Sequence, residues 1–81
     1  MIACHQHDYI EIACMHKFPV KLLLKNGMEI EGIANDTTIN NNREECIILK
    51  TGDKEQIVVL DMIKEMDVQI ENPHFTLVKF D

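Results

Sequence analysis

The first sixteen residues hold most of the cysteine and histidine side chains of the chain, which could bind a metal or transfer a proton. Two of the three cysteines and three of the four histidines lie there, namely Cys4, His5, His7, Cys14 and His16. Thiolates and imidazoles are the usual zinc ligands in proteins. The spacing argues against a zinc site, because there is no Cys-x2-Cys pair and only the isolated Cys46 and His74 follow. We therefore predict no metal and no cofactor, and a small metal-binding module remains an alternative function.

The cysteines themselves are expected to be free thiols. Their number is odd, and the N-terminus lacks the basic region and apolar stretch of an export signal, so we expect a cytoplasmic protein, where disulfides are rare. Cys14 and Cys46 then act as small buried apolar side chains. A disulfide between Cys4 and Cys14, formed if the N-terminus folds back, is the alternative.

Two carboxylates in the same segment, Asp8 and Glu11, have two interpretations. Their three-residue spacing matches a capping box, in which each side chain accepts a backbone N–H at the start of a helix. That pattern predicts a helix over about residues 8–16. Capping can be their whole role, or they can also contact a partner.

The predicted helix has two different sides. At about 100° per residue, an apolar side is made of Tyr9, Ile10, Ala13 and Cys14. The other side carries Asp8, Glu11 and Met15, with Ile12 at its edge. A helix of about two turns is marginal alone, so its apolar side must pack on the rest of the domain.

The remainder of the chain alternates between apolar and polar residues with a period of two, which is typical of strands. Asn26-Gly27 predicts a two-residue hairpin turn, and residues 35–43 predict a polar loop. The expected strands cover about 20–25, 28–35, 44–50, 55–60, 64–70 and, as a last short strand, 75–80. One helix followed by short antiparallel strands predicts a single mainly β (α+β) domain over residues 1–81, closed as a small antiparallel β-barrel.

Composition excludes several classes of function. The chain has 8 Lys+Arg against 14 Asp+Glu, a formal charge of -6, which disfavours direct nucleic-acid binding and favours a basic partner. No apolar run is long enough to cross a membrane. We find no Gly-rich phosphate loop and no nucleophile beside a base, so we predict that the protein is not an enzyme.

The order of several short motifs resembles one known family, the Rho-binding antiterminators (Rof), which are small bacterial inhibitors of the transcription termination factor Rho. The strongest motif is Cys-x3-Asp-x2-Glu-[Ile/Leu]-Ala-Cys, formed by Cys4, Asp8, Glu11, Ile12, Ala13 and Cys14. The others, in order, are the hairpin at 22–27, the segment 34–36, Glu44 before an apolar strand, and Leu60-Asp61-x-Ile63. The resemblance spans nearly the whole chain.

That resemblance implies a fold, a partner and a contact surface. The fold is an N-terminal helix on an Sm-like barrel. The partner is the N-terminal RNA-binding domain of Rho, whose primary RNA site is basic, and the bound inhibitor blocks loading of nascent RNA. The acidic helix is the part of the family expected to meet Rho, and Asp8 and Glu11 match it; the resemblance also implies a contact from the loop before the third strand, at Asn41 and Asn42 beside Arg43. Ile12 and Met15, beside the two acids, are expected to supply the apolar part of the interface. We also expect contacts from Tyr9 and from His7, just before the helix.

The chain departs from the family just before Asp8, where the family is often acidic or aromatic and this sequence has His5-Gln6-His7. Histidines there predict Rho binding that depends on pH. We expect a monomer when free. The main alternative is an Sm-like RNA-binding ring, which requires basic and aromatic residues at the inter-strand loops, where this chain offers Asn35-Asp36 and Leu60-Asp61.

Overall fold

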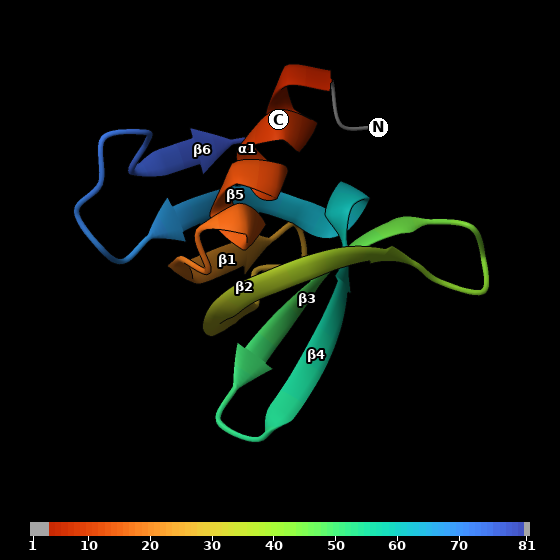
Figure 1. Cartoon of the computed structure of the whole chain (residues 1–81). Helices are drawn as coiled ribbons and strands as arrows, with labels where there is room; N and C mark the ends of the chain where they lie inside the picture. The colour runs from red at the N-terminus through yellow and green to blue at the C-terminus, as the bar shows by residue number, and fades with distance from the viewer. Residues whose placement is uncertain (1–3, 81) are drawn as a thin grey trace.

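The computed structural model describes the backbone of residues 4–80 and the side chains of residues 6–80. One helix precedes six strands (Figure 1). The elements are α1 (Cys4–Met15), β1 (Pro19–Leu24), β2 (Glu29–Ile39), β3 (Glu45–Thr51), β4 (Lys54–Val59), the 3-10 turn η1 (Leu60–Met62), β5 (Ile63–Val68) and β6 (Leu77–Lys79). Within residues 4–80 there is no helix with the length and apolar character needed to cross a membrane.

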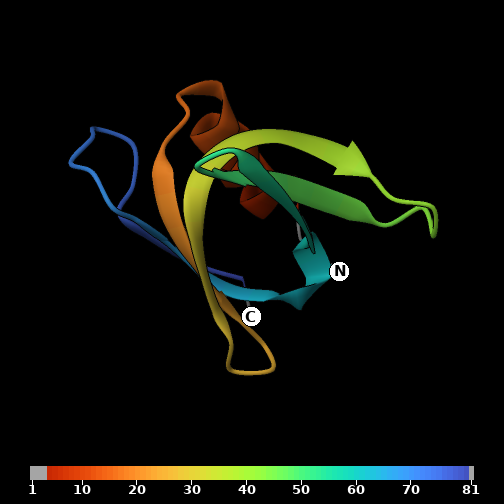
Figure 2. The same ribbon diagram turned by 90° about the horizontal axis from the view of Figure 1, so that it is seen from below.

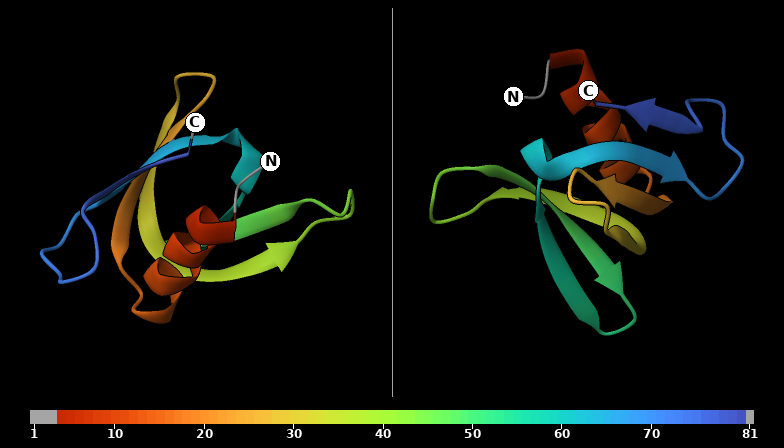
Figure 3. Two further views of the ribbon diagram at one scale, coloured as in Figure 1. Left: turned by 90° about the horizontal axis from the view of Figure 1, so that it is seen from above. Right: turned by 180° about the vertical axis from the view of Figure 1, so that it is seen from behind.

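The strands form one antiparallel sheet in the order β4-β3-β2-β1-β5-β6. The sheet curves round on itself into an open barrel (Figure 2), and α1 lies across one end of it (Figure 3). This is the Sm-like architecture that the sequence predicted. The turn η1 carries the chain from β4 to β5, which are consecutive in sequence but have three other strands between them in the sheet.

The core fills the space between the curved sheet and the helix. Alternate residues of β1 point inward, and the buried side of α1 packs on β2. The buried set is Ile10, Ala13, Cys14, Phe18, Val20, Leu22, Leu24, Ala34, Ile47, Leu49, Val58, Leu60, Ile63, Met66, Val68, Val78 and Phe80. Burial of apolar surface, which stabilises a fold by about 25 cal/mol per Å², is the main interaction that holds the helix on the barrel.

The helix begins earlier than predicted, which changes the role of its acidic residues. α1 starts at Cys4 rather than near residue 8, so Asp8 and Glu11 lie in its interior and no acidic residue is in its first turn. Backbone N–H groups beyond the first turn are already bonded within a helix, so none is left for these carboxylates to cap. The capping-box prediction is therefore wrong, and both side chains are available for other contacts.

The first hairpin is also different in detail from the prediction. Its loop has three residues, Lys25 to Gly27, rather than two: Leu24 N donates to Met28 O at 2.8 Å, and Gly27 N donates to Leu24 O at 2.9 Å. Gly27 has φ 90°, the left-handed region that glycine adopts at low cost. A tight turn followed by a left-handed glycine is a common three-residue hairpin loop.

Strand β2 is longer than predicted, because residues 35–39, expected in a loop, pair with β3 as far as Ile39 opposite Glu45. The pairing skips Asn35, which forms a bulge between Ala34 and Asp36. Thr37 to Ile39 are β-branched and suit a strand, although their polar neighbours favour a turn. The bulge lies beneath the C-terminal half of α1, where it shapes the site described next.

Candidate functional site

The side of α1 that faces away from the barrel carries acidic and apolar side chains together. Asp8 and Glu11 are exposed, and Met15 is 72% exposed, although it is a large apolar residue. Ile10 and Ala13 on the opposite side are completely buried. The predicted division of the helix into two sides is therefore confirmed, and we call Asp8, Glu11 and Met15 the outer stripe.

The two other expected contacts in the helix are partly used by the fold. Ile12 is half-buried and packs against the core. Tyr9 is half-buried as well, and its ring meets the ring of Phe75 edge to face at a centroid distance of 5.2 Å. Both residues hold the helix against the barrel, so only the remaining exposed part of each is free for a partner.

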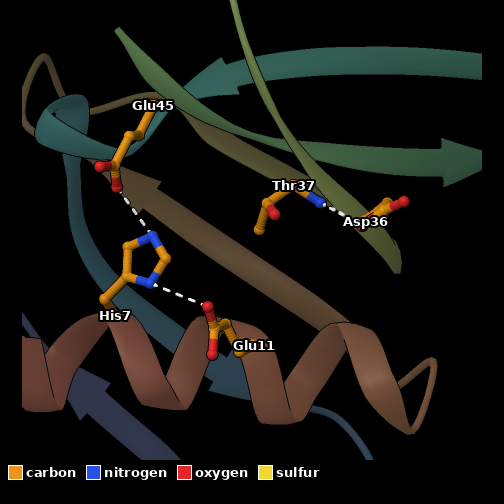
Figure 4. A network of polar contacts seen from close by, with 5 residues as sticks. All are labelled: His7, Glu11, Asp36, Thr37 and Glu45. Atoms are coloured by element: carbon orange, nitrogen blue, oxygen red, sulfur yellow. Dashed lines mark hydrogen bonds and ion pairs between the residues drawn. The ribbon is translucent and has the colours of Figure 1, made fainter.

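His7 connects the helix to the third strand. Its Nδ1 lies 3.4 Å from Oε1 of Glu11, one helical turn away, and its Nε2 lies 2.7 Å from Oε2 of Glu45 at the start of β3 (Figure 4). Both ring nitrogens of His7 therefore face a carboxylate oxygen, and the ring lies between Glu11 on the helix and Glu45 on the strand. This link fixes the orientation of the Glu11 carboxylate beside the outer stripe.

A groove separates the C-terminal half of α1 from β2. Its volume is about 370 Å³, and its walls are Glu11, Cys14, Met15, Lys17, Asn35, Asp36 and Thr37. Glu11 and Met15 belong to the outer stripe, whereas Asp36 approaches from the strand just after the bulge. Oδ1 of Asp36 accepts a hydrogen bond from the Thr37 N–H at 2.8 Å, which leaves its second oxygen available.

The end of the helix supplies Lys17, the cation among the described residues that line this groove. Phe18 N donates to Ala13 O at 3.0 Å and Lys17 N donates to Cys14 O at 3.2 Å, the pair of bonds of a Schellman ending. Lys17 takes the left-handed conformation that this ending requires, with φ 53°. Its ammonium donates to the Asn35 carbonyl, which the bulge leaves out of the ladder between β2 and β3.

The floor of the groove is the thiol of Cys14, which is only 7% exposed. The pKa of this thiol is raised to about 11, mainly by burial; the negative charges of Asp36 and Glu11 contribute to the rise, and the positive charge of Lys17 opposes it. A thiol with this pKa is neutral at physiological pH and is not a nucleophile. The effect on Cys14 also means that both carboxylates make the floor of the groove electrically negative.

The loop expected to form a second contact follows β2. Asn40 organises it: Oδ1 of Asn40 accepts the N–H groups of Asn42 and Glu44, each at 2.9 Å, and Arg43 has φ 63°. Asn41 and Asn42 are exposed at its tip. The His7–Glu45 contact joins α1 to the strand that leaves this loop, so the two expected contact regions are mechanically connected.

The described side chains do not gather into a metal site. Within residues 6–80 no group of three or more His, Cys, Asp and Glu side chains could hold a metal ion. His16 stacks on Phe18 and on His74, at centroid distances of 5.2 and 4.9 Å, well away from His7. Cys14 and Cys46 are free thiols, and burial raises the pKa of Cys46 too. The side chains of Cys4 and His5 lie outside the described residues.

Three residues of this surface could not be found from the sequence. Asp36 was expected in a loop, and the sequence patterns assigned no role to Lys17 or Glu45. Only the fold brings them to the helix. The Asn35-Asp36 pair inside a run of β-branched residues was the available signal of a bulge.

Comparisons with known proteins agree with this fold. The model of the family "Modulator of Rho-dependent transcription termination (ROF)" matches residues 1–80. Among solved structures, the chain is similar to YaeO bound to magnesium from Vibrio cholerae O395, with 38% sequence identity and a TM-score of 0.87, over 91% of this chain and 96% of that chain. A search of curated proteins found no match.

Proposed function

Because the chain belongs to the ROF family of modulators of Rho-dependent transcription termination, we propose that it inhibits Rho by binding the N-terminal RNA-binding domain of Rho and blocking the loading of nascent RNA. The observation that carries this proposal is the outer stripe. Two exposed carboxylates, Asp8 and Glu11, lie next to the exposed Met15 on a helix whose other side is anchored in the core.

The chemistry of the outer stripe suits a surface built for RNA. Such a surface holds phosphates with Arg and Lys side chains, and carboxylates accept the same charge-assisted hydrogen bonds. A formal charge of -6 attracts the protein to a basic surface over a distance, which speeds association. Met15 adds apolar contact area, which charges alone do not provide.

The protein acts as a monomer in this proposal. β6 pairs with β5 along Glu65 to Asp67 and so covers the edge of β5 that would otherwise be open. A ring assembled through the β4 and β5 edges would have to displace β6. Asn41 and Asn42 add a second contact from the loop after β2.

The test is a double charge reversal on the outer stripe. Asp8→Lys with Glu11→Lys places two cations against a basic site, and loss of charge-assisted bonds predicts at least about a 10-fold weaker affinity for Rho. Asp53→Lys in the turn between β3 and β4, with Glu55→Lys in β4, changes the net charge equally and is the matched control. Both pairs are exposed, so circular dichroism should show a folded domain in each case.

Size-exclusion chromatography with Rho, with and without RNA, tests whether the protein binds Rho and whether RNA competes with it. Co-elution that is lost on adding RNA supports competition for the RNA site, and higher salt should weaken the complex. If the Asp8 and Glu11 double variant bound Rho and displaced its RNA at wild-type concentrations, the outer stripe would not be the contact surface. Co-elution that persists with RNA in place would refute the blocking mechanism.

A further inference from the structure

We propose that Asn26, at the tip of the hairpin between β1 and β2, is a site of spontaneous deamidation, and that the folded turn controls this modification by holding its two reacting groups in hydrogen bonds. The modification is a hydrolysis, which consumes water, releases ammonia and replaces the side-chain amide by a carboxylate. The site is separate from the outer stripe, and its chemistry does not require Rho.

The reaction joins two neighbouring residues of the hairpin loop. The backbone nitrogen of Gly27 attacks Cγ of Asn26, an N–Cγ bond forms and the Cγ–Nδ2 bond breaks, so that Nδ2 leaves as ammonia with the proton of the Gly27 N–H. Water then opens the five-membered imide at either of its two carbonyl carbons. One opening gives aspartate. The other gives isoaspartate, in which the main chain runs through the side-chain carbons and is longer by a methylene group.

The residue that follows an asparagine decides how easily this attack occurs. The chain has asparagines at 26, 35, 40, 41, 42 and 72, and Asn26 is followed by glycine, whereas the others are followed by Asp, Asn, Arg or Pro. A Cβ on the following residue hinders the approach of its nitrogen, and proline has no N–H. The turn requires this glycine, because Gly27 has φ 90°. The residue that allows the turn therefore also makes Asn26 the most reactive asparagine of the chain.

The loop is open to the water that the hydrolysis consumes. Residues 25–28 are all exposed, and a Cβ placed on Gly27 would have no atom within 4 Å beyond its chain neighbours. The hairpin projects from the body of the sheet, away from α1 (Figure 2). Water therefore reaches both reacting groups without any movement of the core.

The folded turn restrains both reacting groups. The Gly27 nitrogen must lose its proton to attack, yet the Gly27 N–H donates to Leu24 O at 2.9 Å. Cγ of Asn26 must turn towards that nitrogen, yet Oδ1 of Asn26 accepts the Met28 N–H at 3.0 Å. Attack needs the two atoms about 3–3.5 Å apart with their orbitals aligned. Hydrogen-bonded amides become free only when the structure opens locally, so deamidation proceeds from the opened turn.

Isoaspartate at this position would loosen the centre of the sheet. The added methylene group lengthens the loop that closes β1 on β2, where Leu24 N donates to Met28 O at 2.8 Å. β1 lies between β2 and β5, so a displacement at its end affects the pairing with both. The new carboxylate also adds one negative charge close to Glu29. Deamidation is therefore an irreversible change that accumulates with the age of the molecule.

The test measures isoaspartate in the full-length protein during incubation in mildly alkaline buffer. Isoaspartyl methyltransferase with a labelled methyl donor quantifies the product, and mass spectrometry of proteolytic peptides locates it. A synthetic peptide of residues 22–31 in the same buffer gives the rate without the folded turn, since an isolated hairpin is marginal in water. We expect isoaspartate at Asn26 in both samples, with a rate at least about 10-fold lower in the folded protein. Equal rates, or no isoaspartate at Asn26 in the peptide, would overturn the proposal.

Two variants separate the role of the turn from a general loss of folding, and urea unfolding checks that each is folded. Asn26→Gln keeps an amide but would have to close a six-membered ring, so the label should disappear; label that persists would place the reaction elsewhere. Lys25→Gly keeps the reacting pair and favours the open loop, so the folded protein should react about 2- to 5-fold faster while its peptide is unchanged. An unchanged rate in folded Lys25→Gly, or the same acceleration in its peptide, would show that opening of the turn does not control the reaction.

Discussion

The buried thiol of Cys14 makes the stability of the domain depend on alkaline pH in a way that can be calculated. In the unfolded chain the thiol has its ordinary pKa of 9.0, and burial raises it to about 11 in the folded protein. A raised pKa on an acidic group means that the unfolded chain loses the proton first. The contribution of the neutral, buried thiol to the free energy of unfolding is therefore fully present below pH 9. It is lost progressively as the pH rises from 9 to 11.

The magnitude follows from the two pKa values. The two pKa values differ by about two pH units. The free energy of unfolding should therefore fall by ~1.4 kcal/mol at pH 10, and by ~2.7 kcal/mol at a pH where the thiol is ionised in both states. The variant Cys14→Ala has no group to ionise at this position. Because it packs less well, its free energy of unfolding should be about 1 kcal/mol lower than that of the wild type at neutral pH. Its stability should therefore fall less steeply than that of the wild type, and should overtake it above about pH 10.

Urea unfolding followed by far-ultraviolet circular dichroism, at pH 7, 9, 10 and 11 with a reducing agent, gives the free energy of unfolding of both proteins. Cys46 and the lysines titrate in both, so their effect cancels in the difference. If the two stabilities stayed parallel across this range, the Cys14 thiol would not be shielded from solvent in the folded state, and it could not form the floor of the groove.

Three other perturbations test the scaffold around the site. In Gly32→Ala, the added Cβ would lie 3.0 Å from the Lys50 carbonyl oxygen, which is backbone and cannot move aside. Urea unfolding should therefore show a free energy of unfolding that is lower by about 1–3 kcal/mol. An unchanged midpoint would mean that β2 and β3 separate easily there. Asn40→Ala leaves two loop N–H groups without their acceptor, so their amide hydrogen exchange should become at least about 5-fold faster with the core amides unchanged; equal rates would show that the loop does not depend on Asn40. His7→Ala should cost less than about 1 kcal/mol, because Glu45 is mostly exposed, yet exchange of the first-turn amides of α1 should accelerate; a larger stability loss would contradict this view of the contact.

Much of the fold could be read from the sequence because it depends on local patterns. The alternation of apolar and polar residues located all six strands to within a few residues, apart from the far end of β2. The periodicity of α1 correctly divided Ile10 and Ala13 from Asp8 and Glu11. These patterns are reliable because one side of each element must be buried, whatever its neighbours are.

The errors occur where a contact between distant residues decided the local structure. The helix starts at Cys4 instead of near Asp8, and its first turn is held by Gln6, whose amide donates to Lys79 O at 3.3 Å, and by His7 on Glu45. Capping signals are local, so they do not predict contacts with residues far away in the sequence. The capping signal at Asp8 was real as a local propensity, but tertiary packing outweighed it.

The composition of the outer stripe could be predicted from local patterns, since Asp8, Glu11 and Met15 follow from the helical repeat and from the burial of the opposite side. That the stripe adjoins a groove followed from the fold alone, because the bulge in β2 brings Asn35 and Asp36 to the C-terminal half of the helix. The physical reason is that periodicity fixes which way a side chain points from its own element. Which other element it meets depends on the curvature of the sheet and on where the helix docks, and both are set by the packing of the whole core.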